Sequence, residues 1–229
     1  MRLVTATTLA LAGAVSIATL QAQGMQDTAH KVPTGGIRGA GWQGRPDPGT
    51  GAATEASFDL KGSDIEIHTG PQMLYWNTAN KMTGDYTVSA TITEPKFESS
   101  MDHPHPYGVF IAGNDLDGSN ATALYCAVYG NGTVIVRAFP TSFSPNTSRR
   151  PAASDAANKA AGKGEPVTQQ VSMSVKGDTV TCDVNGKNVA SLKKADLVGD
   201  GKLKSLDGYA GIRVAHNVDV NVKDFKATK

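Results

Sequence analysis

Residues 107–139, YGVFIAGNDLDGSNATALYCAVYGNGTVIVRAF, constrain the fold more than any other part of the chain. An apolar run over 107–112 is followed by two alternating segments, 122–129 and 133–139, which a Gly-Asn-Gly sequence at 130–132 separates. Strict alternation is typical of β-strands, and Gly and Asn tolerate the positive φ that a tight hairpin requires. We therefore predict three strands joined by two turns.

The alternation gives these strands two different faces. One face is small and aliphatic and is assigned to the core; it carries Leu124, Cys126, Val128, Val134, Val136 and Ala138. The opposite face carries Tyr125, Tyr129 and Arg137 together with Ala127, Ile135 and Phe139. Such an aromatic and arginine-bearing face is unusual for a solvated surface, so it is the first candidate for binding.

Most of the remaining chain also reads as short strands. The 25 Gly and 11 Pro residues, with no long helical period, favour an all-β domain with many turns. We expect about eleven strands, mostly antiparallel, which suits two packed sheets in a jelly-roll sandwich.

The first 22 residues are organised like a signal peptide. Met1-Arg2 gives a short positive start, residues 3–20 form an apolar, Ala-rich core, and Ala22 is a small residue before a cleavage point. We expect a secreted or periplasmic protein whose signal peptide spans 1–22; a retained membrane anchor is the alternative.

The rest of the chain divides into a lead and one domain. Residues 23–54 are rich in Gly, Pro and Thr without an apolar period, which predicts a flexible lead. Residues 55–229 are expected to form the β-sandwich domain. Within it, residues 140–166 are rich in Ser, Ala, Asn, Lys and Pro, which predicts a long surface excursion.

Charge and cysteine content limit the partners. Without Arg2 the 22 basic residues become 21, which equals the 21 acidic residues, so neither nucleic acid nor, after signal cleavage, a membrane is an expected partner. The oligomeric state is left open. Cys126 and Cys182 lie on apolar faces of predicted strands and form either one disulfide or two buried thiols.

Several motifs in their order along the chain resemble a known fold family. They are Gly84-Asp85-Tyr86, then YGVFI at 107–111, VSMSVKGDTVTCDVNGKNVAS at 171–191, and GYAGIRVAHNVDVNVKDFK at 208–226. This order resembles the concanavalin A-like lectin/glucanase fold over about residues 56–226. It is most similar to secreted bacterial domains of the 3-keto-disaccharide hydrolase type and to laminin G-like domains.

The resemblance implies that the ligand lies in the concave outer face of one sheet. In such a hollow, aromatic rings stack on sugar C–H faces, and arginine donates paired hydrogen bonds. By alternation Arg213 shares the outer face, so we expect Tyr125, Tyr129, Arg137 and Arg213 to bind carbohydrate. The alternative is that 140–166 covers these residues and that their role is structural.

The segment Asp102-His103-Pro104-His105-Pro106 is a weaker candidate for a metal site. A His-X-His spacing places two imidazoles on one side of an extended segment, and Asp102 or His216 could add a ligand. A solvated or hydrogen-bonded loop is the alternative.

The loop 114–120 superficially resembles a calcium loop through Asp115 and Asp117. Aligned on Gly118, its last ligand position falls on Leu124, where an EF-hand requires Glu, so we predict a turn instead. No cofactor is expected, and a calcium site assembled from several loops is the alternative that stays open.

Acid–base catalysis has only one weak candidate pair. Glycoside hydrolysis usually needs two carboxylates flanking the sugar bond. No strand carries such a set, and Glu66 with His68, which face the same way, is the nearest approach. The function expected first is therefore carbohydrate binding. A hydrolase of 3-keto-glycosides or related saccharides is the second reading, and a structural or adhesive module is the third.

Overall fold

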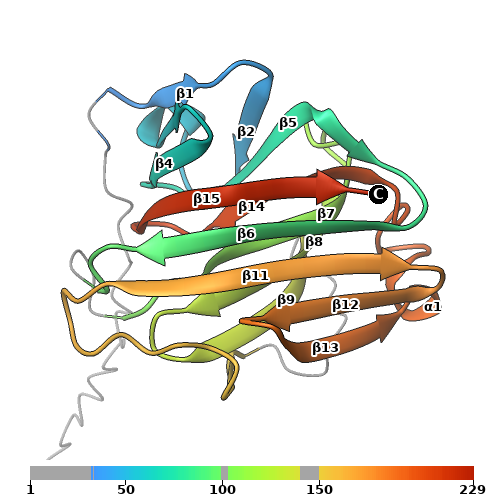
Figure 1. The fold of residues 1–229 in the computed structure, drawn as a ribbon. Helices are drawn as coiled ribbons and strands as arrows, with labels where there is room; N and C mark the ends of the chain where they lie inside the picture. Colours follow the sequence, from blue (N-terminus) through green and yellow to red (C-terminus); the bar gives the residue numbers. More distant parts are fainter. Residues whose placement is uncertain (1–31, 33, 99–102, 140–149) are drawn as a thin grey trace, which may run out of the picture.

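Two sheets pack face to face in the computed structural model, which describes residues 32, 34–98, 103–139 and 150–229 (Figure 1). The predicted signal peptide at 1–22 lies outside the described residues. The eight-stranded sheet runs, edge to edge, through β1 (Gly36–Arg38), β3 (Ser57–Lys61), β4 (Asp64–His68), β15 (Asp219–Thr228), β6 (Tyr86–Glu94), β11 (Val167–Lys176), β12 (Thr179–Val184) and β13 (Lys187–Lys193).

The second sheet has seven strands and lies behind β15, β6 and β11 in Figure 1. Its order is β10 (Ala152–Ala153), β9 (Thr133–Phe139), β8 (Thr122–Tyr129), β7 (Tyr107–Asn114), β14 (Gly208–Val214), β5 (Met73–Met82) and β2 (Trp42–Pro46). The named strands pair antiparallel except for β1 with β3. A 3₁₀ turn at Ala53–Glu55 and the short helix α1 (Lys194–Leu197) complete the described elements. The predicted all-β jelly-roll sandwich is confirmed.

The strands that the sequence did not predict are β1, β2 and β10, and all three lie at sheet edges. A short edge strand carries too few alternating apolar residues to show a period.

The predicted boundary at residue 55 is corrected by two of these strands. β1 and β2 lie within the predicted flexible lead 23–54, yet each belongs to one of the two sheets. Trp42 at the start of β2 contacts Phe58 and Phe225, with ring centroids 4.7 and 5.4 Å apart. The domain therefore includes residues 36–54, because the burial of one tryptophan and two strand pairings outweigh the Gly- and Pro-rich composition.

The hairpin β8–β9 has the register that the alternation predicted. Tyr125 lies opposite Arg137 and Cys126 lies opposite Val136, so aromatic and aliphatic positions stay on separate faces. The aliphatic face of β8 and β9 packs in the main core between the sheets, which also contains Ile92, Met173 and Ile212.

Cys126 and Cys182 form a disulfide, with a Cα–Cα distance of 6.0 Å. The bond joins β8 of one sheet to β12 of the other, so it ties the two layers together through the core. Its partners are 56 residues apart, and closing a loop of that length stabilises the fold by about 4 kcal/mol in the chain-entropy description. Of the two readings left open by the sequence, the disulfide is confirmed.

The described part of the predicted excursion 140–166 is packed rather than free. Residues 152–153 pair with β9, and Ala156 and Ala157 are buried in the core. The backbone N–H of Asn158 donates to the side chain of Gln169 at 3.0 Å, and the Gln169 amide donates back to the Asn158 carbonyl at 2.8 Å.

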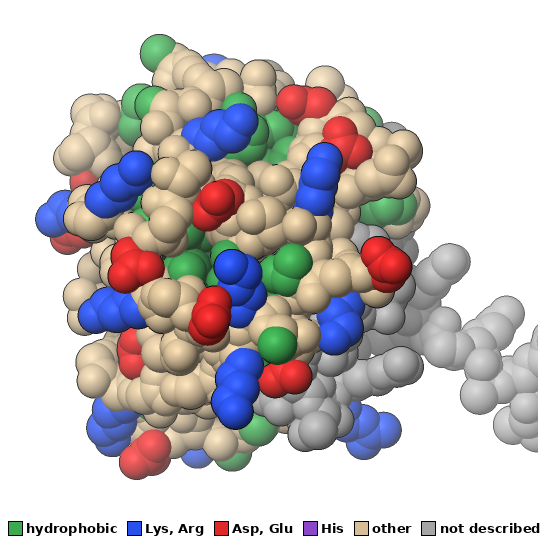
Figure 2. All heavy atoms as spheres, turned by 90° about the vertical axis from the view of Figure 1, so that its right-hand side faces the viewer, with side chains coloured by type: hydrophobic (Ala, Val, Ile, Leu, Met, Phe, Trp, Pro, Cys, Tyr) green, Lys and Arg blue, Asp and Glu red, His purple; other side chains and the backbone are tan. Residues whose placement is uncertain are grey.

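The surface is mixed in charge. Figure 2 shows one end of the sandwich, where Lys and Arg side chains are interspersed with Asp and Glu and no single sign dominates. This face carries no basic stripe of the kind that follows a nucleic-acid backbone. Among the described residues, no helix has the length and apolarity needed to cross a bilayer.

Candidate functional site

The outer face of the seven-stranded sheet contains a hollow of about 560 Å³. Its floor is formed by side chains of β8, β9 and β14, and its walls come from the loop before β7, the turn after β14 and residues 150–151. All four predicted sugar-binding residues line this hollow: Tyr125, Tyr129, Arg137 and Arg213.

Arg213 is held at the base of the hollow by an ion pair. It is only 3% exposed, and its Nη2 donates to Asp47 Oδ2 at 2.7 Å and to Gln72 Oε1 at 3.0 Å, while Nη1 donates to Asp47 Oδ1. Burial opposes the guanidinium charge, but Asp47 outweighs it and leaves the pKa of Arg213 raised. The guanidinium also lies over the Tyr125 ring at 5.0 Å. Arg213 thus connects β14 with Asp47, Gln72 and Tyr125 at the base of the hollow.

Tyr129 and Arg137 are the two predicted residues that remain half-buried and reachable from solvent. Tyr125, in contrast, is buried, at 5% exposure. Burial, with the nearby Tyr125, raises the pKa of Tyr129 to about 12, so its hydroxyl stays protonated at neutral pH. The same hollow therefore offers a neutral aromatic ring and a guanidinium cation.

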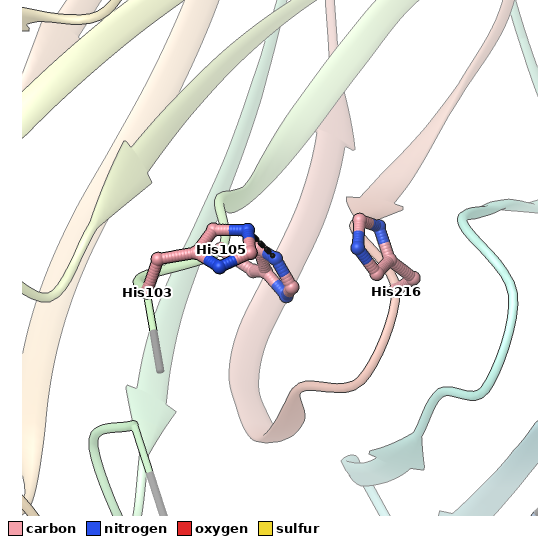
Figure 3. Close-up of side chains that lie close together, drawn as sticks. All are labelled: His103, His105 and His216. Atoms are coloured by element: carbon pink, nitrogen blue, oxygen red, sulfur yellow. Dashed lines mark hydrogen bonds between the residues drawn. The ribbon is translucent and has the colours of Figure 1, made fainter. Parts of the chain in front are cut away.

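Three histidines meet at one wall of the hollow (Figure 3). His103 Nε2 and His105 Nε2 are 2.9 Å apart, and the ring centroids of His105 and His216 are 3.9 Å apart. One donor atom from each ring can be chosen so that all three lie within 4.8 Å of one another. The structure thus brings together the predicted pair with His216, whereas Asp102 lies outside the described residues.

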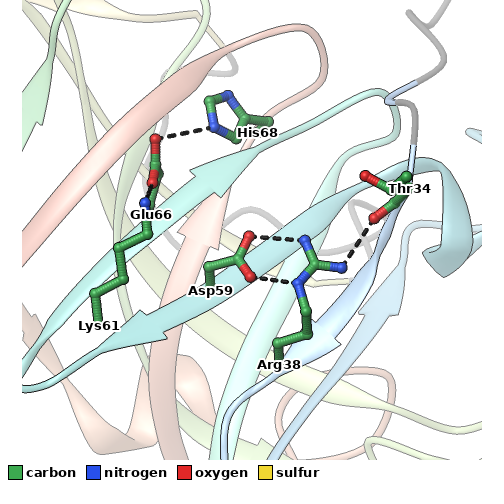
Figure 4. Close-up of polar contacts among 6 residues, drawn as sticks. All are labelled: Thr34, Arg38, Asp59, Lys61, Glu66 and His68. Carbon is green, nitrogen blue, oxygen red and sulfur yellow. Dashed lines mark hydrogen bonds and ion pairs between the residues drawn. The ribbon is translucent and has the colours of Figure 1, made fainter.

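The predicted acid–base pair lies on the other sheet. Glu66 and His68 are on β4 of the eight-stranded sheet, with Glu66 Oε1 3.3 Å from His68 Nε2 (Figure 4). His68 Nδ1 lies 3.0 Å from Asp219 Oδ1. Lys61 pairs with Glu66 as well. Neither Glu66 nor His68 lines the hollow, so the pair shares a face as predicted but does not join the other candidates.

The loop around Asp115 is a turn, as predicted. The Gly118 N–H donates to the Asp115 carbonyl at 2.9 Å, and the Asn120 N–H donates to Asp115 Oδ2 at 3.0 Å. The carbonyls of Leu116 and Gly118 accept from Arg45 Nη1 at 2.6 and 2.9 Å. Arg45 therefore fixes this turn through two of its backbone carbonyls.

Among the described residues that line the hollow, none is an Asp or a Glu. The carboxylate of Asp47 is engaged with Arg213 below the floor. The described lining therefore lacks the two carboxylates on which glycoside hydrolysis usually depends.

Sequence reasoning missed Asp47 and Gln72, which fix Arg213 from outside the predicted central strands. Asp47 follows β2 in the predicted lead, and Gln72 precedes β5. The sequence does place Asp47 between two prolines, which restrict the backbone around this acidic residue. Its partner Arg213 is 166 residues away, so the sequence does not indicate the ion pair.

Comparisons with known proteins identify the fold. No protein-family model matches the chain. No curated protein sequence matches it. An endo-1,3-beta-glucanase from Streptomyces sioyaensis has a TM-score of 0.51 at 12% identity, over 89% of this chain and 95% of the other. A Bacillus subtilis protein of unknown function with a galectin-like fold has a TM-score of 0.50 at 12% identity, over 82% and 88%.

A third similar structure is the carbohydrate recognition domain of Emp46p, with a TM-score of 0.50 at 7% identity, over 82% of this chain and 88% of that one. At such identities the similarity shows the fold and leaves the activity to be argued from the site. The chain therefore has a concanavalin A-like jelly-roll fold.

Proposed function

We propose that this chain is an exported carbohydrate-binding domain that holds a saccharide in the hollow of its seven-stranded sheet. The observation that carries the proposal is that half-buried Tyr129 and half-buried Arg137 both line the hollow. Tyr129 stacks on the apolar face of a sugar ring, and Arg137 donates hydrogen bonds to its hydroxyl or carboxylate groups.

The hollow suits a ligand of this size. Small-molecule sites usually occupy roughly 300–1,000 Å³, and this hollow measures about 560 Å³. Tyr125 and Arg213 also line the hollow, and both are buried, with Arg213 already paired with Asp47. A floor fixed before binding reduces the ordering cost of association.

Export is supported by two features of the chain. The disulfide between Cys126 and Cys182 is of a kind that forms and persists in oxidising compartments. The first 22 residues have the organisation of a secretory signal.

Glycan-array screening followed by calorimetry on the mature chain tests the binding. We expect at least one glycan to bind, and Tyr129→Ala and Arg137→Ala each to weaken that binding about tenfold or more. Tyr209→Ala is the matched control, because Tyr209 lies on the outer face of the same sheet without lining the hollow. Failure of every glycan, or equal binding by the Tyr129 and Arg137 variants, would overturn the proposal.

The two other readings have less support. A hydrolase of 3-keto-glycosides using two carboxylates would need them in the hollow, and the described lining supplies none. A structural or adhesive role would be favoured by full burial of Tyr129 and Arg137, and both are half-buried.

A further inference from the structure

The wall of the hollow carries a second, separate kind of chemistry. We propose that His103, His105 and His216 bind one divalent transition-metal ion of the zinc or cobalt type. This site stands on its own geometry and does not depend on sugar binding.

The donor atoms are already close to the spacing of a metal site. Neighbouring nitrogens in a tetrahedral zinc site with bonds of 2.0–2.1 Å lie about 3.3 Å apart. His103 Nε2 and His105 Nε2 are 2.9 Å apart, and all three donors fit within 4.8 Å. Binding of one ion by all three would require the largest separation among the three donors to shorten from within 4.8 Å toward about 3.3 Å.

The ligand type selects the metal. Imidazole nitrogen suits Zn²⁺, Co²⁺, Ni²⁺ and Cu²⁺, whereas Ca²⁺ and Mg²⁺ require oxygen ligands. The group consists of three histidines and no carboxylate. Three protein ligands leave a coordination position for water or another ligand, as in zinc sites with His₃ coordination.

The two segments that carry the histidines are joined by their backbones. His103 and His105 alternate with Pro104 and Pro106, whose rings fix φ and stiffen the segment. The Ala215 N–H, one residue before His216, donates to the Pro106 carbonyl at 2.9 Å. The distance between the segments is therefore set without the imidazoles.

Hydrogen bonds of the Thr69 hydroxyl hold the turn that bears His216. The buried Thr69 hydroxyl lies 2.6 Å from the Ala215 carbonyl and 2.9 Å from the Val218 carbonyl, and the Val218 N–H donates to it at 3.1 Å. Asn217 adopts φ 54°, a left-handed conformation that Asn tolerates better than most residues. Rigid support of this kind gives metal sites their precision.

His68 provides the internal contrast. Its two ring nitrogens lie 3.3 and 3.0 Å from Glu66 and Asp219, so its position is explained by carboxylates alone. It lies on the eight-stranded sheet, apart from the hollow. A change at His68 therefore removes one imidazole of the chain without removing a proposed metal ligand.

Calorimetric titration with Zn²⁺ tests the proposal on the mature chain, stripped with a chelator and freed of any histidine tag. We expect one ion per chain, and Co²⁺ in its place should give the intense visible absorption of a low-coordinate nitrogen site. His103→Gln and His216→Gln should each weaken Zn²⁺ binding at least tenfold, and His68→Gln should bind as the unchanged chain does. His103 is exposed, so its variant tests the site without disturbing the core.

Absence of Zn²⁺ binding by the unchanged chain would overturn the proposal. Equal binding by the His103 and His216 variants, with far-ultraviolet circular dichroism showing them folded, would overturn it as well. Because the probe is the metal alone, zinc binding without any glycan binding would support this site while refuting the proposed sugar function.

Discussion

The outer faces of the two sheets differ in chemistry although their strands share one geometry. The eight-stranded sheet presents hydroxyl pairs to solvent: Thr87 Oγ1 lies 2.9 Å from Ser174 Oγ, and Thr93 Oγ1 lies 2.8 Å from Thr168 Oγ1. The seven-stranded sheet presents a second hydrophobic cluster, which contains Leu74, Trp76, Phe110, Tyr125 and Phe139. The outer face of the eight-stranded sheet is therefore polar, whereas much of the outer face of the seven-stranded sheet is apolar and buried.

The same difference separates two Arg–Asp pairs. Arg38 and Asp59, on β1 and β3, form a two-point pair in solvent, with Nη2 to Oδ2 at 2.7 Å. Arg213 and Asp47 form a similar two-point pair, but both are buried. A buried pair is far costlier to break than a surface pair, since the remaining charge has no water around it.

The largest expected effect comes from Asp47→Ala, which leaves the Arg213 cation buried without its partner. We expect the free energy of unfolding to fall by about 4 kcal/mol, measured by urea denaturation. Asp59→Ala removes the chemically matched partner on the solvated face and should change stability little. Equal losses in the two variants would show that the faces do not differ in this way.

Leu74→Ala probes the apolar character of the outer face of the seven-stranded sheet. Leu74 is fully buried on that face, so its truncation should cost about 3 kcal/mol in unfolding free energy. Chemical denaturation at neutral pH measures the loss. A cost below 1 kcal/mol would indicate that the cluster is not a packed layer.

The Glu94→Gln variant tests a buried residue of β6, in addition to the residues of the two outer faces. Burial raises the pKa of Glu94 from 4.5 to about 7, although the Glu98 N–H, which donates to Glu94 Oε1 at 3.4 Å, opposes the rise. A carboxyl whose folded pKa lies above its unfolded value favours the protonated state on folding, so the native state loses stability as pH rises from 4.5 to 7.

The Gln variant lacks this titration. Its unfolding free energy relative to that of the unchanged chain should grow by about 3 kcal/mol between pH 4.5 and 7 and then level off. Urea denaturation of both proteins across this pH range gives the difference. A difference that stays constant with pH would assign the effect to packing instead.

The smallest effect is expected from Thr93→Ala, on the solvated face. It removes the hydroxyl contact with Thr168, a cross-strand pair that contributes about 0.5 kcal/mol. The loss should be several times smaller than that of Leu74→Ala in the same assay. A comparable loss would mean that the Thr/Ser face contributes to the fold as much as the apolar one.

Local periodicity was enough to predict much of this arrangement. Alternation placed Tyr125, Tyr129, Arg137 and Arg213 on one face, because the two-residue period of a strand fixes side-chain direction whatever the tertiary structure. It also placed Glu66 and His68 together.

Periodicity does not say which sheet a strand joins. For this reason Glu66 and His68 could not be separated from the hollow before the strand order was known. Two contacts join residues that are far apart in the sequence. Asp47 and Arg213 are 166 positions apart, and His105 and His216 are 111 positions apart. No local sequence pattern encodes such contacts.

The disulfide has a consequence when the molecule is under tension. In the proposed complex, a saccharide in the hollow would pull on the seven-stranded sheet, whereas a load attached at Lys229 would enter through β15 of the eight-stranded sheet. Cys126 belongs to β8, the strand that also supplies Tyr125 and Tyr129 to the floor. Such a force would cross between the sheets at the disulfide, which ends on β12, and would reach β15 through the hydrogen-bonded strands β11 and β6. The covalent bond would therefore resist sliding of one layer over the other in addition to side-chain packing.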